Sequence, residues 1–165
     1  MVAMEERFQS AGGATMTGKE VVRTIMEFMR AAPKFSYRIT IGTDSEVEGG
    51  TMTEFVTAVV VHRIGNGGRY FWRRTRLGKF HTVRDRIIQE VLISLEVAKQ
   101  LLGELEHAGK DELLDWEFEI HADIGSNGKT SAMIREVVAM IRANNFSART
   151  KPGSYAASCV ADRHV

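Results

Sequence analysis

The sequence predicts an α/β domain built on a five-stranded mixed sheet, with strand order 3-2-1-4-5, strand 2 antiparallel, flanking helices and an extra N-terminal helix. Two observations lead to this prediction. Three β-branched runs are separated only by short glycine-containing turns, which is typical of an antiparallel meander. A long helical pattern then returns the chain to the sheet, so a right-handed crossover places the fourth strand parallel to the first.

The N-terminal half contains one helix and the meander. The segment 17–20, Thr-Gly-Lys-Glu, is a capping box that starts an amphipathic helix, and Pro33 ends this helix. The three strands are expected at about 36–44, 53–64 and 69–77. The second run is apolar enough to be covered on both faces, whereas the third is mixed, so we expect the third strand at the edge of the sheet.

The C-terminal half alternates helices with strands. Apolar residues at helical spacing predict a long helix, and the segments that follow it predict a strand, a second helix, a short strand and a last short helix. The approximate ranges are 83–106, 116–123, 130–144, 146–150 and 154–165.

The size and composition of the chain favour a single domain without a signal for export. We expect residues 17–165 to form this domain and residues 1–16, which lack apolar periodicity, to be a flexible tail. A formal charge of +1 excludes a global attraction to nucleic acid or membrane, so any such binding must be local. A single cysteine and the lack of a long apolar N-terminal stretch favour a reducing, cytoplasmic location with no membrane anchor.

Two aspartates each end a β-branched run, Asp44 in the first predicted strand and Asp123 in the fourth. A lone aspartate at a strand end more often caps a turn. Because neighbouring strands lie about 4.8 Å apart, however, these two carboxylates would sit side by side at the carboxyl edge of the sheet, where open α/β sheets bind ligands. The pairing therefore predicts a cation site.

Four separated motifs, in the same order, resemble the YkuK family of RNase H-like proteins. The resemblance covers about residue 17 to the C-terminus and rests on Ile41–Ser45 (Ile-Gly-Thr-Asp-Ser), Glu90–Leu95, His121–Gly128 and Lys151–Ala157 with Ala161–Asp162.

This resemblance implies an RNase H-like fold and a metal-dependent nuclease that hydrolyses phosphodiester bonds of RNA, DNA or a hybrid. RNase H-like nucleases hold two divalent metals with carboxylates from the first strand, the first long helix, the fourth strand and the last helix. By position these become Asp44, Glu90, Asp123 and Asp162, and Mg²⁺ or Mn²⁺ suits such oxygen ligands. The alternative is a non-catalytic nucleic-acid-binding module that keeps the same fold.

Three further assignments each have two interpretations. Glu90 and Glu96 lie at equal angles from the apolar stripe of the long helix, but Glu90 shares its flank with apolar residues, and the family motif places its acid there. His121 could support Asp123 or be hydrogen-bonded inside the sheet, and His164 could assist proton transfer or simply be an exposed terminal histidine.

A basic segment with interleaved aromatic residues lies between residues 69 and 86 and can contact phosphates and stack on bases. The same charges could instead protect an edge strand from aggregation. We assign nucleic-acid contacts to Arg73, Arg74, Arg76, Lys79 and Lys151.

The segment 123–130 also approaches a phosphate-binding P-loop that would use Lys129. That motif requires glycine where Asp123 stands, and a carboxylate there would repel the phosphates. We therefore favour the acidic site over a nucleotide site.

Overall fold

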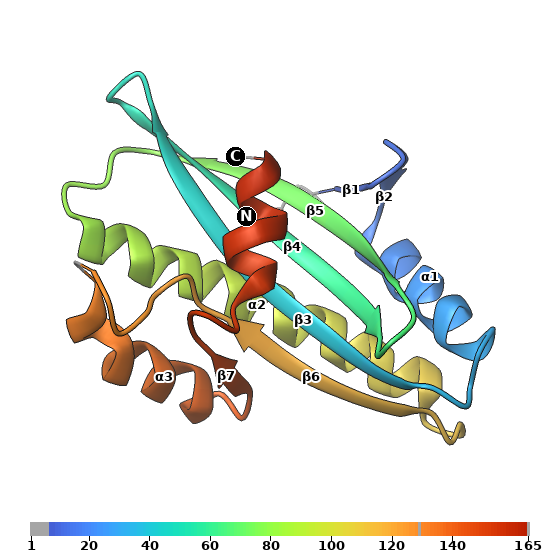
Figure 1. Ribbon diagram of the computed structural model, residues 1–165. Helices are drawn as coiled ribbons and strands as arrows, with labels where there is room; N and C mark the ends of the chain where they lie inside the picture. Colours follow the sequence, from blue (N-terminus) through green and yellow to red (C-terminus); the bar gives the residue numbers. More distant parts are fainter. Residues whose placement is uncertain (1–6, 129, 165) are drawn as a thin grey trace.

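The computed structural model describes residues 7–128 and 130–164, which form a mixed sheet with helices on both faces (Figure 1). The strands are β1 (Phe8–Ser10), β2 (Thr15–Met16), β3 (Ser36–Glu48), β4 (Met52–Arg63), β5 (Gly68–Leu77), β6 (Asp115–His121) and β7 (Ser147–Arg149). The helices are α1 (Gly18–Arg30), α2 (Val83–Gly109) and α3 (Ile134–Ala143), with a 3-10 turn η1 (Ser131–Met133) before α3. A π-helical segment η2 (Ala156–Ala161) continues into a 3-10 turn η3 (Asp162–His164), and we call these two together the C-terminal helix.

The sheet has seven strands rather than the predicted five, and its order is β2-β1-β5-β4-β3-β6-β7. The α/β class and the mixed sheet are confirmed, with β4 antiparallel and β6 parallel to β3. The predicted strand count is wrong, and the order of the whole sheet differs from the prediction, because β1 and β2 extend the sheet beyond β5, which is therefore not an edge strand. The five predicted strands keep their predicted relative order, β5-β4-β3-β6-β7.

Residues 8–16 form the extra hairpin, in place of the flexible tail that the sequence predicted. Phe8 anchors it, because its side chain is 1% exposed and the Arg73 guanidinium lies 5.4 Å from its ring centroid. Gly13 turns the chain at a φ of 91°, a conformation that favours glycine. Strands this short show no alternation that a sequence pattern could detect. Residues 1–6 of the predicted tail lie outside the described residues.

The two faces of the sheet have different covers. Helices α1, α2 and α3 lie on one face, and the C-terminal helix crosses the other (Figure 1). Ile39 and Ile41 of β3 belong to the main core under α1 and α2, whereas Val56 and Ala58 of β4 pack with Ala161 on the opposite face. No helix in the part of the chain that the structure describes is long and apolar enough to cross a membrane.

Strand β3 runs past the predicted end at residue 44 and sorts its polar residues between the two covers. Side chains alternate along a strand, and the Thr43 hydroxyl lies 2.7 Å from that of Ser94 on α2. Asp44 points the other way and hydrogen-bonds to Asp162 of the C-terminal helix. The acids predicted for the site thus come from both sides of the sheet. Asp44 and Asp162 lie on the side of the C-terminal helix, and Glu90 comes from α2 on the other side (Figure 1).

Candidate acidic site

Three aspartates converge where β3 and β6 emerge under the C-terminal helix. The parallel register pairs Gly42 with His121, and Asp44 and Asp123 each follow two residues later. Asp162 is the first residue of η3, and its side chain is hydrogen-bonded to that of Asp44. The predicted neighbourhood of Asp44 and Asp123 is thus present, although β6 ends at His121 rather than at residue 123.

The environment of Asp44 favours its protonated form. Burial raises the pKa of Asp44 to about 7, assisted by the hydrogen bond to Asp162 and by the negative charges of Asp123 and Asp162. The Ser45 amide, whose nitrogen lies 2.9 Å from Asp44 Oδ1, acts in the opposite direction. A hydrogen bond between two carboxyl groups requires a proton, and the raised pKa of Asp44 favours keeping it there.

Glu90 reaches the same region from α2 on the other face. Its side chain is buried, and the Ser45 hydroxyl donates a hydrogen bond to Glu90 Oε1. Burial raises the pKa of Glu90 to about 8, the bond from Ser45 opposes this shift, and the charges of Asp44 and Asp123 add to it. Glu96, the alternative ligand on the same helix, is exposed. Of the two, Glu90 is therefore the one in electrostatic contact with the aspartates.

A chain of buried hydroxyl groups fixes α2 against the sheet beside Glu90. Thr43 Oγ1 lies 2.7 Å from Ser94 Oγ and 3.0 Å from Thr57 Oγ1. The three groups are each no more than 2% exposed, so each of these hydrogen bonds satisfies a polar atom that has no access to water. This network keeps the Glu90 turn of the helix at a defined height above β3.

Lys151 places a positive charge at the acidic edge. Its Nζ lies 3.2 Å from Asp123 Oδ1, on a side chain that is half exposed. The stem of this lysine lies against Gly125, where an added Cβ would come within 2.9 Å of the Lys151 Cβ. Glycine is therefore needed at position 125 for the lysine to lie along the loop. The sequence assigned Lys151 to nucleic-acid contact, but nothing in it indicated this ion pair.

The donor set suits a hard divalent cation, because every candidate ligand is a carboxylate oxygen. Among the described residues, no three acidic, histidine or cysteine side chains stand close enough together to hold a metal ion as they lie. The negative charge is balanced instead by Lys151 and by the proton between Asp44 and Asp162. Binding of Mg²⁺ or Mn²⁺ would thus require these carboxylates to exchange their present partners.

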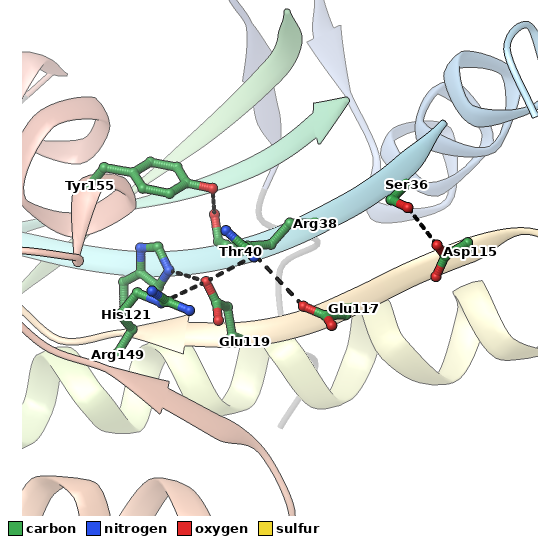
Figure 2. Close-up of polar contacts among 9 residues, drawn as sticks. All are labelled: Ser36, Arg38, Thr40, Asp115, Glu117, Glu119, His121, Arg149 and Tyr155. Carbon is green, nitrogen blue, oxygen red and sulfur yellow. Dashed lines mark hydrogen bonds and ion pairs between the residues drawn. The ribbon is translucent and has the colours of Figure 1, made fainter. Parts of the chain in front are cut away.

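His121 makes its hydrogen bonds in a polar cluster on β6 that is separate from Asp123 (Figure 2). Its Nε2 lies 2.8 Å from Glu119 Oε1, and its Nδ1 accepts a hydrogen bond from the Ala156 amide at 3.2 Å. The interpretation of a histidine hydrogen-bonded inside the sheet therefore holds. The sequence reasoning missed Glu119, although Glu117, Glu119 and His121 alternate on one face of the strand and could have signalled a polar stripe.

His164 is packed rather than free at the chain end. Its ring stacks on Trp72, with centroids 4.4 Å apart, and its Nε2 lies 3.3 Å from the Tyr70 hydroxyl. Burial, followed by the charges of Arg163 and Arg74, lowers the pKa of His164. The stacked ring of His164 thus attaches the end of the C-terminal helix to Tyr70 and Trp72 of β5.

The predicted basic residues do not form one continuous surface. Arg73 is buried on the side of Phe8, whereas Arg74 and Arg76 lie on the opposite face and both pair with the buried carboxylate of Glu54. Arg74 also donates a hydrogen bond to the His164 carbonyl oxygen. Lys79 is exposed in the loop after β5. Arg74 and Arg76, held by Glu54, share the sheet face of Asp44.

The structure describes only part of the alternative phosphate loop, since Lys129 lies outside the described residues. The chain after it forms the turn η1 before α3 begins at Ile134. The helix therefore does not start directly at the loop, as it does in a P-loop.

Comparison with known proteins gives two matches. A sequence model of the Ribonuclease H-like family matches residues 20–165. The uncharacterized protein YkuK of Bacillus subtilis (strain 168) is 33% identical over 164 residues, which cover 94% of this chain and 95% of that protein. No solved structure gives a significant match.

The raised pKa values predict how pH acts on stability. Asp44 and Glu90 keep protons in the folded protein at pH values where the unfolded chain has released them, so stability falls as pH rises from about 4 toward 8. In chelator-treated protein we expect Glu90→Gln to flatten the fall in melting temperature between about pH 5 and 8.5. Glu96→Gln, the exposed control on the same helix, should keep the parent slope. A parent-like slope in Glu90→Gln would contradict the buried, protonated state of Glu90.

Proposed function

Because this chain belongs to the RNase H-like YkuK family, we propose that it is a metal-dependent nuclease that hydrolyses phosphodiester bonds of RNA, DNA or an RNA–DNA hybrid. One observation carries this proposal. Burial raises the pKa of Asp44 on β3 and of Glu90 on α2, and the negative charge of Asp123, in the segment after β6, adds to both shifts, while Asp162 of the C-terminal helix adds to that of Asp44. Such groups of mutually repelling acids are typical of catalytic sites rather than of surfaces selected for stability.

The residues that would hold Mg²⁺ or Mn²⁺ are Asp44, Glu90, Asp123 and Asp162. When bound, such ions lower the pKa of water and stabilise negative charge on a phosphodiester. Asp44 and Asp162 would then accept as two full carboxylates, because the reason for sharing a proton is removed. Ser45 keeps Glu90 directed toward β3 through its hydrogen bond.

The cations of the chain have defined roles in the same proposal. Lys151, once released from Asp123, can donate to a phosphate oxygen at the acidic edge, and Arg74 and Arg76 lie on the same sheet face as Asp44. Arg73 is excluded from such a role because it is buried against Phe8 on the other face. The nucleic acid is therefore expected to cross the face that carries the C-terminal helix. Cys159 is a free exposed thiol, which suits the reducing cytoplasmic setting that we propose.

A second candidate function is a nucleic-acid-binding module without catalysis. The observation that favours it is the Lys151–Asp123 ion pair, because a fixed ammonium can replace a metal in balancing an acidic site. The two candidates differ in what removal of a carboxylate does, since only the nuclease loses a metal-dependent activity.

The cleavage test compares Glu90→Gln with Glu96→Gln. Over a panel of RNA, DNA and hybrid oligonucleotides with Mn²⁺, the first variant should lose on the order of 10²-fold or more in rate, the scale for removal of a positioned catalytic group. The second should match the parent, because Glu96 is exposed. Equal rates for both variants would remove Glu90 from the site, and no metal-dependent cleavage of any substrate by the parent would leave the binding module as the function.

The Lys151→Met variant tests the competition between the ammonium and the metal. Without the lysine, repulsion at Asp123 is less balanced, so the metal-free protein should melt at a lower temperature and the rise in melting temperature caused by Mn²⁺ should be larger than in the parent. Lys99→Met, at an exposed position of α2, serves as the control. A smaller Mn²⁺ effect in Lys151→Met than in the control would show that Lys151 does not compete for the site.

A further inference from the structure

Glu119 is a buried carboxylate that the acidic site does not use. Only 5% of the residue is exposed, yet three positively charged or polar partners surround it (Figure 2). His121 Nε2 lies 2.8 Å, Arg149 Nε 3.1 Å and Arg38 Nε 3.6 Å from the same oxygen, Glu119 Oε1. Burial alone would raise the pKa of Glu119, but the hydrogen bond from His121 and the charges of Arg149 and Arg38 hold it below its usual value. Glu119 is therefore an ionised acceptor.

An ionised Glu119 determines which nitrogen of His121 carries the proton. The carboxylate can only accept, so Nε2 must donate to it, and Nδ1 is left with a lone pair. That lone pair accepts the Ala156 amide at 3.2 Å. Both ring nitrogens are thus engaged, and the side chain links the sheet to the C-terminal helix rather than acting as a base.

The Ala156 amide is the place where this link matters. Amides in the first turn of a helix have no partner within the helix, and the side chain of the N-cap residue Tyr155 does not cap this one. The His121 ring fills that role from a different element. Tyr155 adds a second attachment, since its hydroxyl lies 3.4 Å from Thr40 Oγ1 and its ring meets the His121 ring edge-on.

The same carboxylate also restrains the chain segment that leads to Lys151. Arg149 of β7 pairs with Glu119 through its side chain, and its carbonyl oxygen accepts the Ala122 amide at 2.9 Å. Lys151 follows two residues later, and Asp162 lies within the C-terminal helix as the first residue of η3. Glu119 thus contacts both segments that complete the acidic site, β7 directly through Arg149 and the C-terminal helix through His121.

We propose that Glu119 and His121 are positioning residues, which hold the start of the C-terminal helix through the Ala156 amide and thereby set Asp162 against Asp44. The inference rests on the proposed function in one respect, that Asp162 is a ligand of the catalytic metal. Glu119 and His121 themselves touch neither metal nor substrate.

Two isosteric substitutions separate the two bonds of His121. In His121→Asn the amide oxygen stands near the place of Nδ1 and can still accept from Ala156, whereas in His121→Gln the amide stands near Nε2 and keeps only the contact with Glu119. The readouts are the Mn²⁺ concentration at half-maximal rise of the melting temperature, kcat and KM for cleavage, and hydrogen exchange of the Ala156 amide.

We expect His121→Asn, which keeps the acceptor for Ala156 but loses the bond to Glu119, to show a smaller defect than His121→Gln. His121→Gln should fold but need about 10-fold to 100-fold more Mn²⁺, the range for loss of a group that orients a ligand, with a lower kcat, an unchanged KM and faster exchange at Ala156. His121→Phe should repeat the result of His121→Gln.

Two outcomes would overturn the proposal. One is a parent-like Mn²⁺ requirement in His121→Gln despite fast exchange at Ala156. The other is an equal defect in the folded Asn and Gln variants, because the acceptor for Ala156 would then be irrelevant. If the parent neither responds to Mn²⁺ nor cleaves, the proposed function fails, and the exchange at Ala156 alone decides whether His121 positions the helix.

Discussion

The repulsion between carboxylates that are partly removed from water is the constraint on which this structure depends. Asp44 and Glu90 can be buried near Asp123 only if their charge is balanced, and the chain balances it with protons, with the Ser45 hydroxyl and with the ammonium of Lys151. Each of these partners is weaker than a divalent cation close to several carboxylates. The proposed metal centre requires the chain to exchange them for one.

The layers of the fold supply these acids from both sides of one sheet. Alternation along β3 directs Asp44 to the C-terminal helix, while its neighbour Ser45 reaches Glu90 on α2. The buried hydroxyls of Thr43, Thr57 and Ser94 fix α2, and the Glu119–His121 pair fixes the C-terminal helix. Two polar networks that lie outside the acidic site thus control the spacing within it.

The sequence predicted what depends on local pattern. The predicted parallel pairing of the first and fourth strands placed Asp44 and Asp123 together, and helical periodicity together with the family motif distinguished Glu90, which is buried, from the exposed Glu96. The features it missed depend on long-range packing. The hairpin of Phe8 and the pairing of Lys151 with Asp123 each join residues far apart in the chain, and no periodicity records them. The assignment of Arg73 to nucleic-acid contact followed the basic residues and interleaved aromatics of the segment 69–86, whereas strand alternation places Arg73 on the face opposite Arg74.

The most direct test of this metal centre is a crystal of the protein soaked with Mn²⁺ and measured near the manganese absorption edge. We predict anomalous density among Asp44, Asp123 and Asp162, with the Lys151 ammonium moved away from Asp123. Density at a different group of residues, or an unchanged Lys151–Asp123 pair with no density beside it at a saturating Mn²⁺ concentration, would contradict the claim that these carboxylates form a metal centre.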